Sequence, residues 1–123
     1  MREELVSFET AKLAREKGFN ESCNFYYQRG VISTDGHFSR YNKGVDYICS
    51  APTQSLLQRW LREEKGYYVY PFFDNEELKW TYVVREKTGD MWIPLIGETP
   101  YYDCFEEAME NVLKFTLENL IEL

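Results

Sequence analysis

The stretch from residue 67 to residue 96 most restricts the possible folds, because two turn sequences divide it into three short runs rich in aromatic and β-branched residues. The runs are residues 67–73, 78–86 and 91–96, and such runs favour strands. The intervening Asp74-Asn75-Glu76-Glu77 and Lys87-Thr88-Gly89-Asp90 are typical of turns. The pattern therefore predicts a three-stranded antiparallel meander.

Symmetric closure of the two turns predicts that Phe73 faces Leu78 and that Glu86 faces Met91. Side chains alternate between the two faces of a sheet, so each face can be assigned. The predicted core face comprises Val69, Phe73, Leu78, Trp80, Tyr82, Val84, Ile93 and Leu95. The second face comprises Tyr68, Tyr70, Phe72, Lys79, Thr81, Val83, Arg85, Trp92, Pro94 and Ile96. Pro71 lacks an amide donor, which predicts that the first strand lies at an edge.

Two helices are predicted before the meander. The first covers residues 7–18, with Ser7 as the N-cap and Gly18 at the end. The second is central to the chain: Thr53 is its predicted N-cap, Gly66 ends it, and an apolar stripe runs along one side. The stripe consists of Leu56, Leu57, Trp60 and Leu61.

A third helix begins, by our prediction, at Asp103, which with Glu106 forms an Asp-x-x-Glu variant of the capping box. Its wide apolar stripe is the strongest helical signal in the chain. The stripe consists of Phe105, Ala108, Met109, Val112, Leu113, Thr116, Leu117, Leu120 and Ile121. We expect this helix to lie across the core face of the meander.

Between the first two helices, the sequence predicts an N-terminal hairpin with strands at residues 22–28 and 31–33. It also predicts a short strand at residues 45–49. The expected fold is therefore α+β, a mainly antiparallel sheet of hairpin plus meander with three helices, in the order α-ββ-α-βββ-α. A chain of 123 residues predicts a single domain, residues 1–123.

The charge balance limits the classes of partner. Twenty-one acidic residues against 14 basic ones give a net charge of −7, which disfavours nucleic acid and anionic membrane surfaces. The sequence contains no long apolar run and no hydrophobic N-terminal signal. Three widely spaced cysteines without a C-x-x-C pattern fit a reducing compartment. We therefore expect a cytoplasmic protein.

No residue pattern predicts catalysis, a metal or a cofactor. His37 is the single histidine, and nothing near Cys23, Cys49 or Cys104 in the sequence indicates a Cys–His nucleophile pair or a zinc site. The acidic pairs are explained by helix ends and solvated faces. The glycines lie at element ends and form no phosphate-binding motif. We predict a protein that is not an enzyme and carries no cofactor.

The candidate site is the aromatic group on the second face: Tyr68, Tyr70, Phe72 and Trp92. Burial of these rings, by another part of the chain or by a partner, is favoured over a platform that stacks bases or sugars. The leading hypothesis is an acidic interaction or accessory protein that acts through a protein surface, with a protein partner or self-association as a homodimer. The alternative is a small-ligand binding module with an aromatic pocket on the meander.

Two stretches, residues 7–19 and 50–63, resemble uncharacterised small proteins of phages and prophages of gut anaerobic bacteria. The most specific part is Ala51-Pro52-Thr53-Gln54 followed by Trp60-Leu61-Arg62-Glu63. The order of elements along most of the chain is also similar. The resemblance implies a bacterial cytoplasmic setting and a mobile-element origin. The family has no established activity, so the resemblance implies no functional residues.

Overall fold

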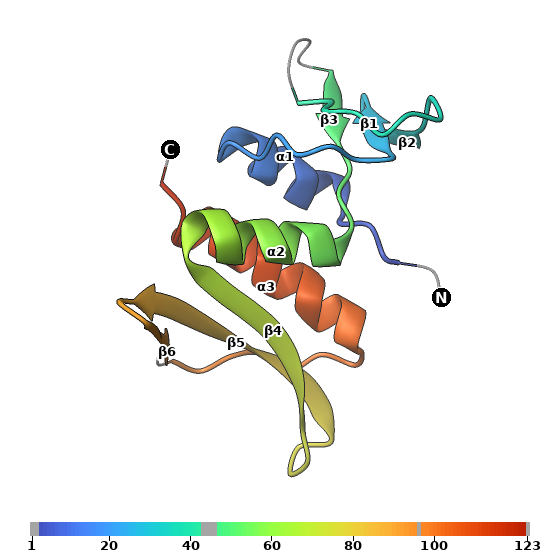
Figure 1. Ribbon diagram of the computed structural model, residues 1–123. Helices are drawn as coiled ribbons and strands as arrows, with labels where there is room; N and C mark the ends of the chain where they lie inside the picture. Colours follow the sequence, from blue (N-terminus) through green and yellow to red (C-terminus); the bar gives the residue numbers. More distant parts are fainter. Residues whose placement is uncertain (1–2, 43–46, 96, 123) are drawn as a thin grey trace.

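The computed structural model describes residues 3–42, 47–95 and 97–122. Within these residues the chain forms three helices and two three-stranded antiparallel sheets, which confirms the predicted α+β class (Figure 1). The elements in chain order are α1 (Phe8–Glu16), β1 (Tyr26–Gln28), β2 (Val31–Ser33), β3 (Ile48–Ser50), α2 (Gln54–Lys65), β4 (Tyr67–Asp74), β5 (Lys79–Thr88), β6 (Met91–Pro94) and α3 (Phe105–Asn119).

The caps predicted for the first two helices are present. The Ser7 hydroxyl accepts a hydrogen bond from the Thr10 amide at 3.2 Å, and the Thr53 hydroxyl accepts one from the Leu56 amide at 3.1 Å. Both satisfy amides that the first helical turn leaves free. Gly66 ends α2 in the left-handed conformation with φ of 76°, where a residue without a Cβ avoids strain.

The predicted start of α3 is wrong. The N-cap is Cys104 rather than Asp103, and no side chain makes a capping hydrogen bond, so Asp103 and Glu106 form no capping box. Asp103 lies one residue too early, and its carboxylate instead accepts a hydrogen bond from the Lys79 ammonium at 2.9 Å. The acids Glu106 and Glu107 still lie in the first turn, where the helix dipole favours negative charge.

The N-terminal sheet has the strand order β2–β1–β3. The turn between β1 and β2 is Arg29-Gly30, and both residues have positive φ angles, 52° and 82°, which suits a tight two-residue hairpin. The first strand is shorter than predicted, since residues 22–25 lie outside β1. The third strand covers residues 48–50 instead of 45–49, and residues 45 and 46 lie outside the described residues.

The meander is antiparallel with the order β4–β5–β6, which places Pro71 on an edge strand as predicted. The register differs from the prediction, because Phe73 pairs with Trp80 and Glu86 pairs with Ile93. The first hairpin has a longer loop, in which Leu78 takes a φ of 57° and leaves the strand. A two-residue shift preserves the alternation, so the predicted faces hold for the residues that lie within β4, β5 and β6. Leu78 and Leu95 lie outside these strands, and Ile96 lies outside the described residues.

Helix α3 crosses the face of β4 and β5 that was predicted to be the core, and α2 packs beside it (Figure 1). Val69, Tyr82 and Val84 of the sheet are buried, as are Leu113 and Leu117 of α3. The predicted core face is only partly covered by α2 and α3. Its outlying members remain exposed: Phe73, Leu78, Ile93 and Leu95.

The N-terminal half joins the same hydrophobic core. The rings of Phe19 and Trp60 meet edge-on with centroids 5.4 Å apart, which connects the segment after α1 to α2. The Tyr27 hydroxyl donates a hydrogen bond to the Val6 carbonyl at 2.7 Å. Among the described helices, none combines the length and apolar character that a bilayer crossing requires.

Candidate functional site

Three of the four predicted site residues meet on the second face of the meander. The ring centroids of Tyr68 and Tyr70 are 4.8 Å apart, and those of Tyr68 and Trp92 are 6.0 Å apart. All three side chains are half-buried. We call Tyr68, Tyr70 and Trp92 the ring cluster.

Cations lie over each ring of this cluster. The Arg62 guanidinium carbon is 5.7 Å from the centroid of Tyr68, that of Arg85 is 6.0 Å from Tyr70, and the Lys87 nitrogen is 5.8 Å from Trp92. Arg85 Nε also donates a hydrogen bond to the Tyr70 hydroxyl at 2.9 Å. These contacts within the chain cover part of the aromatic surface and stabilise it.

The sequence does not predict the contact of Arg62 with the Tyr68 ring, because this contact depends on α2 lying beside β4. The i, i+2 alternation of a strand places Arg85 and Lys87 on the same face as the rings, and this alternation can be read from the sequence. The sequence prediction places Arg85 on this face and Lys87 in a turn.

Phe72, the fourth predicted residue, is not part of the ring cluster. It lines a separate cavity of about 420 Å³ beside β5, together with Val83, Leu95 and Phe115. The alternative hypothesis placed a ligand pocket on the meander, and this cavity lies there. Of the four predicted aromatic residues, only Phe72 contributes to its described lining.

A different aromatic surface lies at the end of the β4–β5 hairpin. We call it the hairpin-end patch and define it as Phe73, Leu78, Trp80, Tyr101 and Phe105. Trp80 is at its centre, with ring centroids 5.5 Å from Phe73 and 5.5 Å from Phe105, both edge-to-face. Trp80 is half-buried and the other four side chains are exposed.

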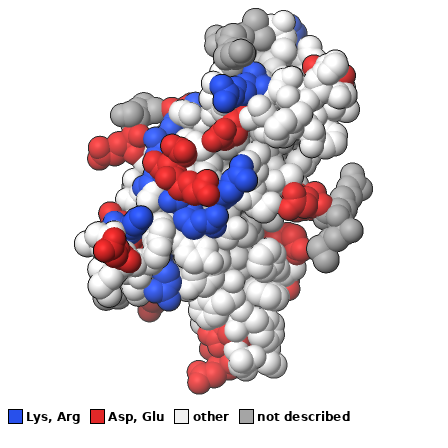
Figure 2. All heavy atoms as spheres, in the orientation of Figure 1, with Lys and Arg blue, Asp and Glu red and all other residues white. Residues whose placement is uncertain are grey.

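Acidic side chains border the hairpin-end patch. Asp74 accepts hydrogen bonds from the amides of Glu76 (2.9 Å) and Glu77 (3.2 Å), which lower the pKa of its carboxyl group. The Tyr101 hydroxyl donates to the same carboxylate at 3.1 Å. Asp74 is therefore ionised at neutral pH. Acidic side chains gather at this end of the molecule beside a large uncharged area (Figure 2).

Lys79 lies beside the hairpin-end patch, and its ammonium is already paired with Asp103 at 2.9 Å. The border therefore presents a surplus of negative charge around exposed aromatic rings. Phe73, Leu78, Trp80 and Phe105 were predicted as core residues, so the sequence did not identify this patch. The exposure of a hairpin tip depends on how far α3 extends over the sheet, which local patterns do not determine.

The cysteines and the histidine do not form a catalytic arrangement in the described part of the chain. Burial raises the pKa of Cys23 to about 12 and that of Cys49 to about 11, which keeps both thiols protonated at neutral pH. No hydrogen bond in residues 3–42, 47–95 and 97–122 joins His37 to a cysteine. Within these ranges, no group of three or more His, Cys, Asp and Glu side chains could hold a metal ion.

Comparison with protein-family models, curated proteins and solved structures finds no match for this chain. The function must therefore be inferred from the chemistry of the chain's own surfaces.

Proposed function

We propose that this protein is a non-enzymatic interaction protein that binds a basic segment of a partner protein at the hairpin-end patch. The observation that carries the proposal is the conformation of Leu78. Its side chain is 71% exposed, and its backbone has a φ of 57°.

A leucine in this conformation costs stability. Left-handed backbone brings the Cβ close to the carbonyl oxygen and is unfavourable by about 1–2 kcal/mol, so glycine or asparagine usually occupies such positions. An exposed leucine side chain recovers little of this cost through burial. A contact outside the folded chain would account for a bulky apolar residue here, because strained residues cluster at binding sites.

The neighbouring rings supply a firm surface for that contact. Phe73 and Phe105 hold Trp80 between them, so ordering these side chains on binding would cost little further entropy. Aromatic side chains are also enriched at the centres of protein interfaces.

The charge around the patch selects the partner's chemistry. The border carries Asp74, Glu76, Glu77 and Asp103, and Lys79 neutralises the last of these, which favours a segment rich in lysine and arginine. The net charge of −7 also attracts basic partners at long range. We therefore expect the partner to place an apolar side chain against Leu78 and basic side chains against the acidic border.

The test is selection from a displayed library of random peptides, with wild-type protein and the Leu78→Asn variant as separate baits. Wild-type protein should enrich peptides that combine basic residues with leucine or aromatic residues, and Leu78→Asn should lose this enrichment. Met91→Ala is the matched control, because it removes another exposed apolar side chain away from the hairpin end. Equal enrichment on wild-type protein and Leu78→Asn would refute the proposal.

Self-association as a homodimer is a separate candidate, because two copies joined at the hairpin-end patch would bring their acidic borders together. Size-exclusion chromatography with light scattering at several concentrations distinguishes the cases. A dimer that Leu78→Asn converts to a monomer would identify the second copy as the partner. A dimer that persists in Leu78→Asn and is lost in Trp92→Ala would instead place the interface at the ring cluster.

A small-ligand binding module is the second candidate function, and the cavity beside Phe72 supports it. Its volume of about 420 Å³ falls in the usual range of ligand sites, about 300–1,000 Å³. Thermal-shift screening against apolar ligands, with Phe72→Ala as the variant, tests this candidate. A cytoplasmic location and an origin among phage or prophage proteins remain proposals that rest on the sequence.

A further inference from the structure

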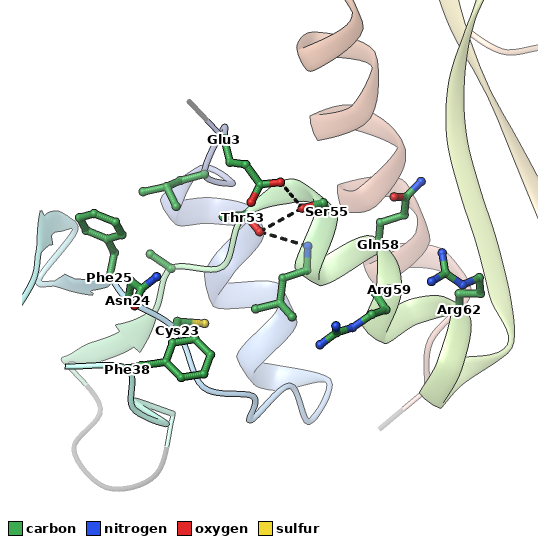
Figure 3. Close-up of a pocket in the computed structure, with 13 residues that line it drawn as sticks. Glu3, Cys23, Asn24, Phe25, Phe38, Thr53, Ser55, Gln58, Arg59 and Arg62 are labelled. Atoms are coloured by element: carbon green, nitrogen blue, oxygen red, sulfur yellow. Dashed lines mark hydrogen bonds between the residues drawn. The ribbon is translucent and has the colours of Figure 1, made fainter. Parts of the chain in front are cut away.

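A second cavity lies between α2 and the segment that precedes β1. Its volume is about 570 Å³. It opens among side chains from the segment before α1, from the region around β1, and from α2 (Figure 3). This cavity is independent of the hairpin-end patch, because the two share no residue.

One wall of the cavity is aromatic and apolar. Phe25 and Phe38 lie on the side away from α2, and Leu5, Ala51 and Leu56 complete the apolar part. Phe38 is 67% exposed, which is unusual for a phenyl ring that lines a cavity. A planar apolar ligand would bury both rings.

The α2 wall carries the positive charge. Figure 3 shows Arg59 extending from α2 toward the side where Phe38 lies. Its ion pair with Glu63 is 3.9 Å long, and both side chains are more than half exposed, so this pair is weak. Arg62 follows one turn later and lies over the Tyr68 ring. The guanidinium of Arg59 is therefore available to an incoming anion.

The single acidic residue among the described lining residues is already engaged. The Glu3 carboxylate accepts a hydrogen bond from the Ser55 hydroxyl at 2.6 Å. The Glu3 carboxylate is held by Ser55, and Figure 3 shows Arg62 turned away from Phe25 and Phe38, so Arg59 supplies the positive charge on the side of the aromatic wall. A guanidinium beside an apolar wall suits an anionic ligand that carries an apolar body.

We propose that this cavity binds a small planar aromatic acid, with its ring system against Phe25 and Phe38 and its carboxylate on Arg59. The apolar wall supplies the burial, and the guanidinium supplies a charge-assisted hydrogen bond that an uncharged analogue cannot form. The cavity thus distinguishes aromatic acids from neutral aromatic molecules.

The experiment compares 2-naphthoate with its neutral analogue 2-naphthamide by NMR titration of the isotope-labelled chain. Wild-type protein should bind 2-naphthoate roughly tenfold more tightly than 2-naphthamide, the ratio that about 1.4 kcal/mol produces. Shifts should concentrate at residues 23–25, 38 and 53–59. Arg59→Gln should remove the preference for the acid, and Phe38→Ala should weaken the binding of both compounds.

Two controls separate this site from the other surfaces. Arg85→Gln removes a cation from the ring cluster and should leave naphthoate binding unchanged, and so should Leu78→Asn at the hairpin end. Equal affinity for the two compounds in wild-type protein would overturn the proposal. So would shifts centred on the meander, or the absence of any shift at millimolar concentrations of both compounds.

Discussion

Glu110 of α3 caps α1 through Ser7, although the two residues are 103 positions apart in the sequence. The Glu110 carboxylate accepts hydrogen bonds from the Ser7 amide at 3.0 Å and from the Ser7 hydroxyl at 2.8 Å. The buried hydroxyl of Thr10 donates to the same carboxylate. One side chain of the last helix therefore satisfies polar groups at the start of the first and places a negative charge where the helix dipole favours it.

Replacing Glu110 tests how strongly this contact stabilises the fold. Glu110→Ala leaves the Thr10 hydroxyl without its acceptor in a buried position, which should lower the free energy of unfolding by about 1–3 kcal/mol. Urea denaturation followed by tryptophan fluorescence measures the change. Glu118→Ala is the matched control on the same helix, where a partly exposed pair with Lys114 at 3.8 Å should contribute little. Equal losses in the two variants would contradict the capping role.

The two predicted caps at Thr53 and Asp103 should respond differently to alanine. Thr53→Ala removes a capping hydrogen bond present in the structure and should cost about 1 kcal/mol. Asp103→Ala removes only an exposed ion pair with Lys79, for which about 0–1 kcal/mol is typical. Thermal and urea unfolding of both variants under one buffer condition makes the comparison. A greater loss of stability in Asp103→Ala than in Thr53→Ala would support the capping box that the sequence predicted.

The cysteines should differ in reactivity. Cys104 is exposed, whereas Cys23 and Cys49 are buried with raised pKa values. A thiol reagent at pH 8 should therefore modify one cysteine rapidly in the native protein and all three after unfolding. Cys104→Ser should abolish the fast reaction. Rapid modification of that variant would mean that the buried thiols open to solvent.

The same burial predicts a dependence of stability on alkaline pH. The folded-state pKa of Cys23, about 12, and that of Cys49, about 11, lie above the ordinary value of 9.0. The unfolded chain therefore loses these protons at lower pH than the folded chain does. The contribution to stability is complete below pH 9 and is lost as the pH rises toward 11 or 12. Replacing both residues with alanine should flatten the alkaline fall of the free energy of unfolding, and an unchanged fall would contradict the assignment.

Features that depend on neighbouring residues were predictable from the sequence. Ser7 and Thr53 are caps because a hydroxyl reaches an amide three positions on, and Gly66 ends α2 because it adopts positive φ without strain. The faces of the meander were predictable because side-chain alternation survives a two-residue shift in register. Pro71 identified the edge strand for an equally local reason.

Features that depend on packing were not predictable. Loop length in the β4–β5 hairpin changes the register, and turn composition alone does not determine whether Leu78 belongs to the strand or to the loop. The contact of Arg62 with Tyr68 requires the relative position of α2 and β4. The hairpin-end patch was missed for the same kind of reason, since periodicity identifies an apolar face but not the length over which a helix covers it.

Trp92→Ala separates the ring cluster from the proposed binding surface. The substitution removes the edge contact with Tyr68 and the cation over the ring, and should lower the free energy of unfolding by about 1–2 kcal/mol. Peptides selected on the wild-type protein should still bind, because the hairpin-end patch is intact. Fluorescence anisotropy with one labelled peptide measures this. Loss of peptide binding in a variant that remains folded would place the binding site on the second face of the meander, as predicted from the sequence.

Leu78 should be a position where wild type is not the most stable sequence. Asparagine tolerates left-handed backbone better than leucine, so Leu78→Asn should raise the free energy of unfolding by about 0.5–1 kcal/mol. Gly66→Ala is the reciprocal change. The added Cβ would meet Lys87 Cβ at 3.8 Å, which is an ordinary contact. The substitution should nevertheless destabilise the protein, because the backbone at this position has a φ of 76°. Urea unfolding of the two variants should therefore show shifts of opposite sign. If Leu78→Asn instead destabilised the chain, the leucine would be contributing to the fold itself, and its strain would no longer indicate a partner.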